Sequence, residues 1–293
     1  MRRDLGVAEW IHEAIPEAVL VGIGLLTQLG DVWFLAVVIT AVYALRPGDR
    51  DGVAFVAGLS LVGAASLELL KSTLARPRPP LVSADPEALT GLLAELYRLT
   101  ATADGYGLPS GHAMLGAIVY LGLATAISVG RRRTRLRVAT VLILLVAASR
   151  VLLGVHYLVD VLLGLALGTG IVLLGVGLRR RLGRGAVPVA FAVGLAIALG
   201  NAGAHGLDAE ATALLGATIG AMGGWYLGQP TWIERTSGRG RDWRRVAVGV
   251  PVLAVLVALL LVAAGGSVWP DLGLGLAVAV GVGVVLALPT RGG

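Results

Sequence analysis

The chain has 293 residues, of which 56% are hydrophobic and only 14% are charged. A soluble domain is typically about one quarter charged, so the composition excludes an ordinary soluble protein and predicts a membrane protein. The net charge of +6 does not indicate nucleic-acid binding, because the arginines gather in three short loops between apolar runs, at 131–137, 179–184 and 235–245. Such loops are typical of the cytoplasmic side of a membrane protein. The absence of cysteine excludes disulfides, thiolate catalysis and cysteine-bound zinc.

The apolar runs predict ten helical membrane spans, since they are much longer than the strands of a membrane barrel. Six are expected at about 15–29, 32–46, 52–72, 109–129, 138–155 and 157–178. Four more are expected at about 187–204, 209–228, 246–265 and 271–289. We therefore expect an all-α polytopic membrane protein with both termini inside. It would consist of a six-helix core at 1–180 and a C-terminal extension of about four helices at 181–293.

The third expected span ends at a cluster of cations. Lys71, the only lysine, is followed by Arg78 and Pro79 in a segment rich in proline. Proline stiffens the backbone and can hold both cations toward one anion. The alternative is that these side chains only reach from apolar surface to interfacial water. Glu68 precedes Lys71 by one helical turn and is a candidate partner that sets the position of the ammonium group.

A second polar cluster, Pro109-Ser110-Gly111-His112, opens the fourth expected span. The free backbone N–H groups of a first helical turn favour an anion. Gly111 permits close approach of the backbone, and the hydroxyl of Ser110 adds a donor. His112 can transfer a proton near neutral pH. A helix cap that happens to contain a histidine is the alternative.

A third cluster lies between the fifth and sixth expected spans, where Ser149-Arg150 precedes His156 and Asp160. Residues four apart on a helix share a face, so Asp160 can bond one imidazole nitrogen of His156 and leave the other free to attack phosphorus. Arg150 offers a two-pronged donor to phosphate oxygens. The alternative is a buried structural His–Asp pair. The expected topology places all three clusters at one membrane face, which favours a shared site.

Together the clusters resemble the signature motifs of the type 2 phosphatidic acid phosphatase family, which also occur in soluble acid phosphatases and vanadium haloperoxidases. The matching patterns are Lys71-x6-Arg78-Pro79, Pro109-Ser110-Gly111-His112 and Ser149-Arg150-x5-His156-x3-Asp160. The resemblance covers residues 1 to about 180 and implies a six-helix core that works without a metal or cofactor. It implies that His156 is the nucleophile, held by Asp160, and that His112 protonates the leaving group. The implied phosphate-binding residues are Lys71, Arg78, Ser110, Gly111 and Arg150.

We therefore expect a phosphatase that hydrolyses a lipid phosphate or a polyprenyl diphosphate through a phosphohistidine. Its site is expected at the outer face of the cell membrane, where a lipid substrate keeps its tail in the bilayer. One alternative is a phosphotransferase that passes the phosphate to an alcohol. Another is a lipid transporter or flippase coupled to dephosphorylation, in which the last four spans carry the lipid. Asp31, in the first outer turn, is expected to form that turn rather than to take part in catalysis.

Overall fold

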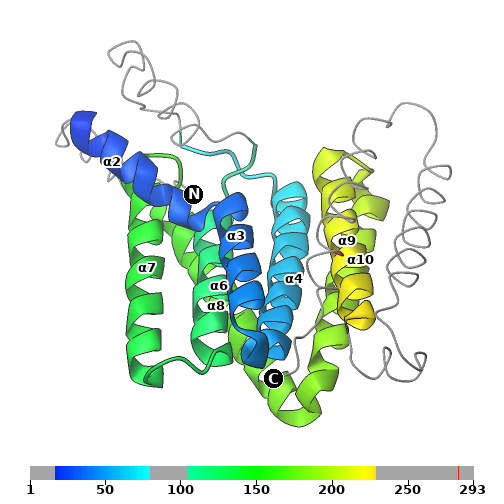
Figure 1. Cartoon of the computed structure of the whole chain (residues 1–293). Coiled ribbons are helices and arrows are strands. Elements are labelled where there is room, and N and C mark those ends of the chain that lie inside the picture. The colour runs from blue at the N-terminus through cyan, green and yellow to red at the C-terminus, as the bar shows by residue number, and fades with distance from the viewer. Residues whose placement is uncertain (1–16, 80–104, 229–282, 284–293) are drawn as a thin grey trace, which may run out of the picture. The chain divides into compact units, whose positions relative to one another are not determined.

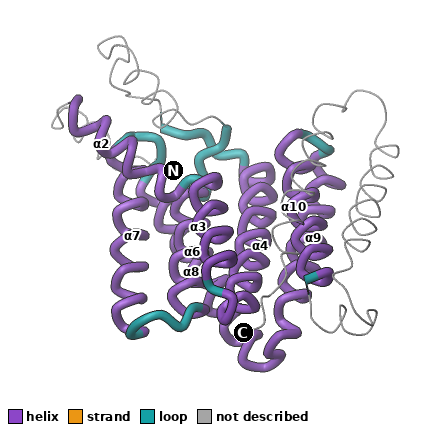
Figure 2. The backbone as a smooth tube through the Cα atoms, viewed as in Figure 1, coloured by secondary structure: helices purple, strands orange, loops and turns teal. Residues whose placement is uncertain are grey.

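The computed structural model of the protein describes residues 17–79, 105–228 and 283. Every regular element in these residues is a helix, either an α-helix or a short 3-10 turn (Figure 2). The chain forms two compact units, the first comprising Met1–Val38 and Leu70–Val176, and the second Ile39–Leu69 and Gly177–Gly293. The all-α class is therefore confirmed for the described residues. The expected division into a core at 1–180 and an extension at 181–293 stays a prediction.

The described helices follow the apolar runs of the sequence. In chain order they are α2 (Glu17–Thr27), η1 (Gln28–Gly30), α3 (Val32–Leu45), η2 (Pro47–Asp49), α4 (Arg50–Leu74), α6 (Gly111–Ala126), α7 (Arg132–Leu152), α8 (Leu158–Leu182), η4 (Gly183–Gly185), α9 (Ala186–His205) and α10 (Ala209–Leu227) (Figure 1). Each of the first eight expected spans coincides with one of these α-helices. The last two expected spans, 246–265 and 271–289, lie outside the described residues.

Two helical segments of the described chain are long and apolar enough to cross a membrane, Pro47–Leu74 and Leu158–His205. The pair Gly22–Gly30 and Val32–Leu45 is bent by 54° at a short break and would count as a third, broken span. Helix α6 is apolar but has only 16 residues. Two to three membrane-spanning segments are thus supported, and the full set of ten stays a prediction.

The arginine clusters were expected in loops, and for two of them this was wrong. Helix α7 begins at Arg132 and contains most of the first cluster, and the last turn of α8 contains Arg179, Arg180 and Arg181. Arginine is a good helix former, so a helix continues past its apolar part when arginines follow. The third cluster, at 235–245, lies outside the described residues.

Helix α7 shows the burial pattern of a helix in contact with lipid. Its apolar residues Val138, Val141 and Leu144 are 54–57% exposed, whereas Ile143 and Val146 are buried. A helix on a water-facing surface would place polar residues on the exposed face. Large exposed apolar surfaces mark sites of contact with membranes or other proteins. The exposed face of α7 therefore agrees with a membrane protein.

Within the first unit, α6 and α8 pack through two glycines one turn apart. A Cβ atom at Gly164 would lie 2.6 Å from the carbonyl oxygen of Ser110, and one at Gly168 would lie 2.4 Å from that of Met114. Only glycine permits this approach, as in other membrane helix pairs with small residues four apart. The contact brings the start of α6 beside the start of α8.

The second unit also has a small-residue interface, between α4 and α9. A Cβ atom at Gly58 would lie 2.8 Å from that of Ala190. Ala65, Ala198 and Leu215 form a buried cluster that joins α4, α9 and α10. Close packing of this kind replaces the hydrophobic effect as the source of helix association in lipid.

Candidate active site

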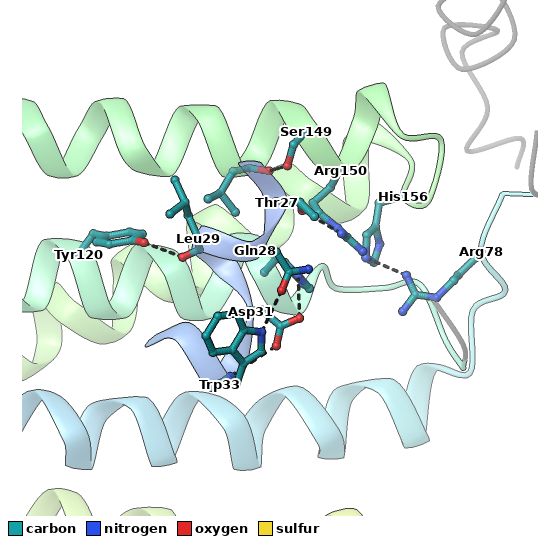
Figure 3. Close-up of polar contacts among 12 residues, drawn as sticks. Thr27, Gln28, Leu29, Asp31, Trp33, Arg78, Tyr120, Ser149, Arg150 and His156 are labelled. Atoms are coloured by element: carbon teal, nitrogen blue, oxygen red, sulfur yellow. Dashed lines mark hydrogen bonds and ion pairs between the residues drawn. The ribbon is translucent and has the colours of Figure 1, made fainter. Parts of the chain in front are cut away.

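The predicted site residues come from four helix ends in the first unit. They lie at the C-terminal ends of α4 and α7 and at the N-terminal ends of α6 and α8, or in the segments that adjoin them. They are Lys71, Arg78, Ser110, Gly111, His112, Arg150, His156 and Asp160. Figure 3 shows the side chains of Arg78 and Arg150 converging on His156.

His156 is buried with one ring nitrogen toward a carboxylate. Its Nδ1 lies 3.7 Å from Oδ2 of Asp160, a little beyond hydrogen-bond distance. The same oxygen accepts the backbone N–H of Tyr157 at 3.1 Å. The carbonyl of Asp160 accepts the N–H of Ser110 at 3.0 Å, which ties the start of α6 to the start of α8. These bonds fix the fully buried carboxylate of Asp160 beside the imidazole ring.

The other ring nitrogen of His156 faces a cation. Nε2 lies 2.8 Å from Nη1 of Arg78 (Figure 3). The same Nη1 also donates to the carbonyl of Val155 at 3.1 Å. A guanidinium group only donates hydrogen bonds, so Nε2 must accept and carries no proton. The neutral ring then holds its proton on Nδ1, toward Asp160. In this tautomer the lone pair lies on Nε2, which can attack an electrophile once the guanidinium of Arg78 donates to the ligand instead.

Burial keeps His156 uncharged. The residue lies in the turn before α8, and burial lowers its pKa from 6.5 to about 4, because a low-dielectric surrounding disfavours the imidazolium. The charges of Arg78 and Arg150 act in the same direction, and Asp160 opposes them. Near neutral pH the ring is therefore neutral, which is the state that a nucleophile requires.

Besides the ring nitrogens of His112 and His156, two buried donors at the site lack hydrogen-bond partners among the described residues. They are the Oγ atom of Ser110 and the Nε atom of Arg150. Arg150 is 2% exposed, and its Nη1 donates to Oγ1 of Thr27 at 2.9 Å (Figure 3). A buried donor without an acceptor costs about 1–3 kcal/mol, so both groups suit a bound anion. The N-terminus of α6, which begins at Gly111, adds backbone donors beside them.

Lys71 and Glu68 lie one turn apart near the end of α4, and both side chains are half-buried. Lys71 is close enough to His112 to act on it electrostatically. A pairing of Glu68 with Lys71 stays a prediction. The helix ends at Leu74, and the N–H of the next residue, Ala75, donates to the carbonyl of Lys71 at 2.9 Å.

Gly107 holds the segment that carries Arg78, and sequence reasoning missed it. Its N–H donates to the carbonyl of Arg76 at 2.8 Å. A Cβ atom at this position would lie 3.2 Å from Cα of Arg78 and 3.2 Å from Oδ2 of Asp160. The glycine therefore allows two segments far apart in the sequence to meet at the site. Nothing in the local sequence distinguishes it from other loop glycines.

The two residues of the Ser149-Arg150 motif have different environments. The hydroxyl of Ser149 donates to the carbonyl of Val146 at 2.7 Å, so it bonds to its own helix (Figure 3). Arg150 extends toward His156 instead. Of this pair, only the arginine offers donors to a ligand.

The turn between α2 and α3 adds two residues to the surroundings of the site. Thr27 holds Arg150, as described above, and Oδ2 of Asp31 lies 3.7 Å from Nε2 of His112. Asp31 also has the expected turn-forming role, because its Oδ1 accepts the N–H of Trp33 at 3.4 Å. In the sequence, a polar break within a long apolar run was the feature that could have pointed to Thr27 and Asp31.

A buried neutral histidine backed by a carboxylate and surrounded by cations is an arrangement suited to phosphoryl transfer. The PAP2 superfamily matches residues 52–184, and the chain contains a PAP2 superfamily domain over these residues. The family resemblance drawn from the motifs is therefore confirmed. Members of this superfamily are generally phosphatases, which suggests a phosphatase acting on phosphate monoesters. No curated protein and no solved structure matches the chain.

Proposed function

We propose that the protein is a metal-independent phosphatase that hydrolyses a lipid phosphate or a polyprenyl diphosphate at the outer face of the membrane. The observation that carries this proposal is the state of His156. Its Nε2 accepts from Arg78, its Nδ1 faces Asp160, and its pKa is lowered to about 4. A histidine in this state, with two arginines beside it, is suited to act as a nucleophile.

In the first step, Nε2 of His156 attacks phosphorus, and the bond from phosphorus to the ester oxygen breaks. The electron pair of that bond stays on the leaving oxygen, which takes a proton from His112. Asp160 accepts the hydrogen bond of Nδ1–H and stabilises the positive charge that develops on the ring. In the second step, water attacks the phosphohistidine, His112 takes up a proton from the water, and phosphate and neutral His156 are released.

The cations and the start of α6 supply the electrostatic part of catalysis. Negative charge on the three non-bridging oxygens is stabilised best by donors that are already in place. Arg78 and Arg150 flank His156, and Ser110 adds a buried hydroxyl that is without a partner in the described chain. Lys71 and the N–H of Gly111 complete the proposed set of phosphate donors.

The course of α7 supports an outward-facing site. Arg135 lies near the start of this helix and Arg150 in its last turn, fifteen residues on and about 22 Å along the axis. The site and the arginine cluster therefore lie near opposite ends of a helix long enough to cross the apolar layer. Positive residues are enriched on the cytoplasmic side of membrane proteins, which favours the opposite side for the site.

Exposed apolar residues next to the site support a lipid substrate. Leu158 and Val159, between the two members of the His–Asp pair, are 40% and 45% exposed. Val32 and Trp33, which follow Asp31, are 64% and 56% exposed. A substrate whose tail stays in the bilayer can reach a site with such a border, whereas a freely soluble substrate gains nothing from it.

The test is phosphate release by the purified protein from a panel of lipid phosphates and diphosphates, with a metal chelator present. We expect hydrolysis of at least one lipid and an acid-labile phosphoenzyme that forms in the wild type and not in His156→Ala. His205→Ala is the matched control, because His205 is exposed at the end of α9 in the other unit. Activity that survives His156→Ala, or that requires an added divalent metal, would refute the mechanism.

A further inference from the structure

The broken helix pair α2–α3 places a turn against the site, and its position is fixed by packing. The hydroxyl of Tyr120 donates to the carbonyl of Leu29 at 2.5 Å (Figure 3). A Cβ atom at Gly30 would lie 2.4 Å from Cγ1 of Val146 and 3.2 Å from Cδ2 of His112. The glycine thus lets the turn approach α6 and α7 more closely than any other residue would allow. The turn lies before the matched residues 52–184.

Two side chains of this turn contact groups of the proposed site. Thr27, which is fully buried, accepts a hydrogen bond from the guanidinium of Arg150 at 2.9 Å. Asp31 places Oδ2 3.7 Å from Nε2 of His112, with the two side chains 33% and 21% exposed. Nε2 of His112 is itself buried and has no hydrogen-bond partner among the described residues. The carboxylate of Asp31 is therefore placed to interact with a proton on this nitrogen.

The charges around His112 are mostly positive, so a nearby carboxylate favours the protonated form that a proton donor needs. The titratable and charged groups that face it come from five elements. They are Asp31 from the α2–α3 turn, Lys71 from α4, Arg78 from the segment after α4, Arg150 from α7 and His156 from the turn before α8. Three of these are cations, and like charges disfavour an imidazolium, whereas a carboxylate at this distance favours it.

We propose that Asp31 is the positioning residue of His112, which it orients and whose imidazolium form it stabilises, so that the imidazolium can protonate the leaving oxygen. This inference rests on the proposed function, in which His112 is the general acid. In the step concerned, the N–H bond of the imidazolium breaks, its electron pair stays on nitrogen, and the alkoxide becomes an alcohol. Asp31 touches neither the substrate nor phosphorus and acts only through His112.

The test compares two substrates that differ in their need for a proton. Dodecyl phosphate releases a basic alkoxide that must be protonated, whereas 4-nitrophenyl phosphate releases a phenolate stable enough to leave unprotonated. The quantity measured is kcat/KM, because it includes the steps up to departure of the alcohol and excludes hydrolysis of the phosphohistidine. We expect Asp31→Asn to lower kcat/KM for dodecyl phosphate by roughly 10- to 100-fold and for 4-nitrophenyl phosphate by less than about threefold.

Two further variants separate positioning from a structural role. Asp31→Glu keeps a carboxylate and is expected to recover most of the activity on dodecyl phosphate. Gln28→Ala removes the 2.8 Å bond from Trp33 to Gln28 in the same turn without changing charge, and should leave the ratio of the two activities unchanged. Equal losses on both substrates in Asp31→Asn would show that the turn is only structural. That result, or no loss on either substrate, would overturn the proposal.

A second measurement does not depend on catalysis. In histidine-labelled protein, the NMR signal of His112, assigned with His112→Gln, reports the protonated fraction of this residue. At the pH where His112 is half protonated in the wild type, Asp31→Asn should show a smaller protonated fraction, and an unchanged fraction would overturn the proposal. Failure of the proposed function would appear separately, as hydrolysis that persists in His156→Ala. The role of Asp31 would then still be decided by the NMR measurement.

Discussion

The contact between α6 and α8 offers a direct test of whether helix spacing sets the activity. Replacing Gly164 with alanine places a Cβ atom 2.6 Å from the carbonyl oxygen of Ser110. A carbon atom and a carbonyl oxygen pack at about 3.3 Å or more, so the helices must separate by about 0.7 Å. Ser110 precedes α6, and Asp160 lies one turn before Gly164 on α8. The displacement therefore acts on the donors of α6 and on the His–Asp pair at the same time.

We expect Gly164→Ala to lower kcat/KM for a lipid phosphate by roughly 10- to 100-fold, since a misplacement of about 1 Å costs about 100-fold. Overpacking should also lower the free energy of unfolding by about 1–3 kcal/mol. The assay is the initial rate of phosphate release in detergent, with the thermal unfolding midpoint measured on the same samples. Gly170→Ala is the matched control, because a Cβ atom at Gly170 on the same helix meets nothing within 4 Å.

Two results would refute this reasoning. Wild-type kcat/KM in Gly164→Ala would show that the spacing of α6 and α8 does not set the geometry of the site. An equal loss in Gly170→Ala would show that any added methyl group on α8 impairs the enzyme, whatever it touches. A fall in the unfolding midpoint of Gly164→Ala alone, with kcat/KM unchanged, would confine the role of the contact to stability.

Two further predictions concern protonation and backbone strain. The pKa of His156 is lowered to about 4. Its NMR signal, assigned with His156→Gln, should therefore stay at the position of a neutral imidazole as the pH falls from about 7 to about 5. Titration near the ordinary value of about 6.5 would contradict this prediction. As the pH falls, His156 becomes protonated in the unfolded chain before it does so in the folded protein. Its contribution to the free energy of unfolding is therefore complete above about pH 6.5 and is lost as the pH falls toward about 4. Ala75 has a positive φ of 45° at the end of α4, a conformation that costs a residue with a Cβ about 1 kcal/mol. Ala75→Gly should therefore raise the thermal unfolding midpoint, and a lower midpoint would show that the strain is absent.

The helices, and the fact that the candidate site residues lie close together, could be predicted because both depend on local sequence. An apolar run long enough to cross a bilayer forms a helix wherever it occurs, and Gly30-Asp31 divides the first run into α2 and α3. The motif residues lie at helix ends, so a consistent topology was enough to bring them together. The arginine clusters were placed wrongly because the apolar pattern ends before the helix does.

The contacts of the α2–α3 turn could not be predicted in the same way. They depend on a tyrosine hydroxyl 91 residues away and on the fit of Gly30 against side chains of α6 and α7. No periodicity in the sequence encodes that fit. A carboxylate in a turn has the same local signature whether or not a histidine lies opposite it, so turn formation was the reasonable expectation for Asp31. Gly107 was missed for the same reason, since its role is defined by Arg78 and Asp160 on other segments.

The unpartnered donors of the site link its stability to its chemistry. Among the described residues of the site, Ser110, His112, Arg150 and His156 each bury a polar side-chain atom that has no hydrogen-bond partner. A partly satisfied polar network costs stability, because each such atom loses its contact with water without gaining another. The close packing at Gly164 and Gly30 holds these groups in place despite that cost. Donors that are fixed before the substrate arrives need no rearrangement as charge develops on the phosphoryl oxygens, and this is the condition under which electrostatic stabilisation of the transition state is largest.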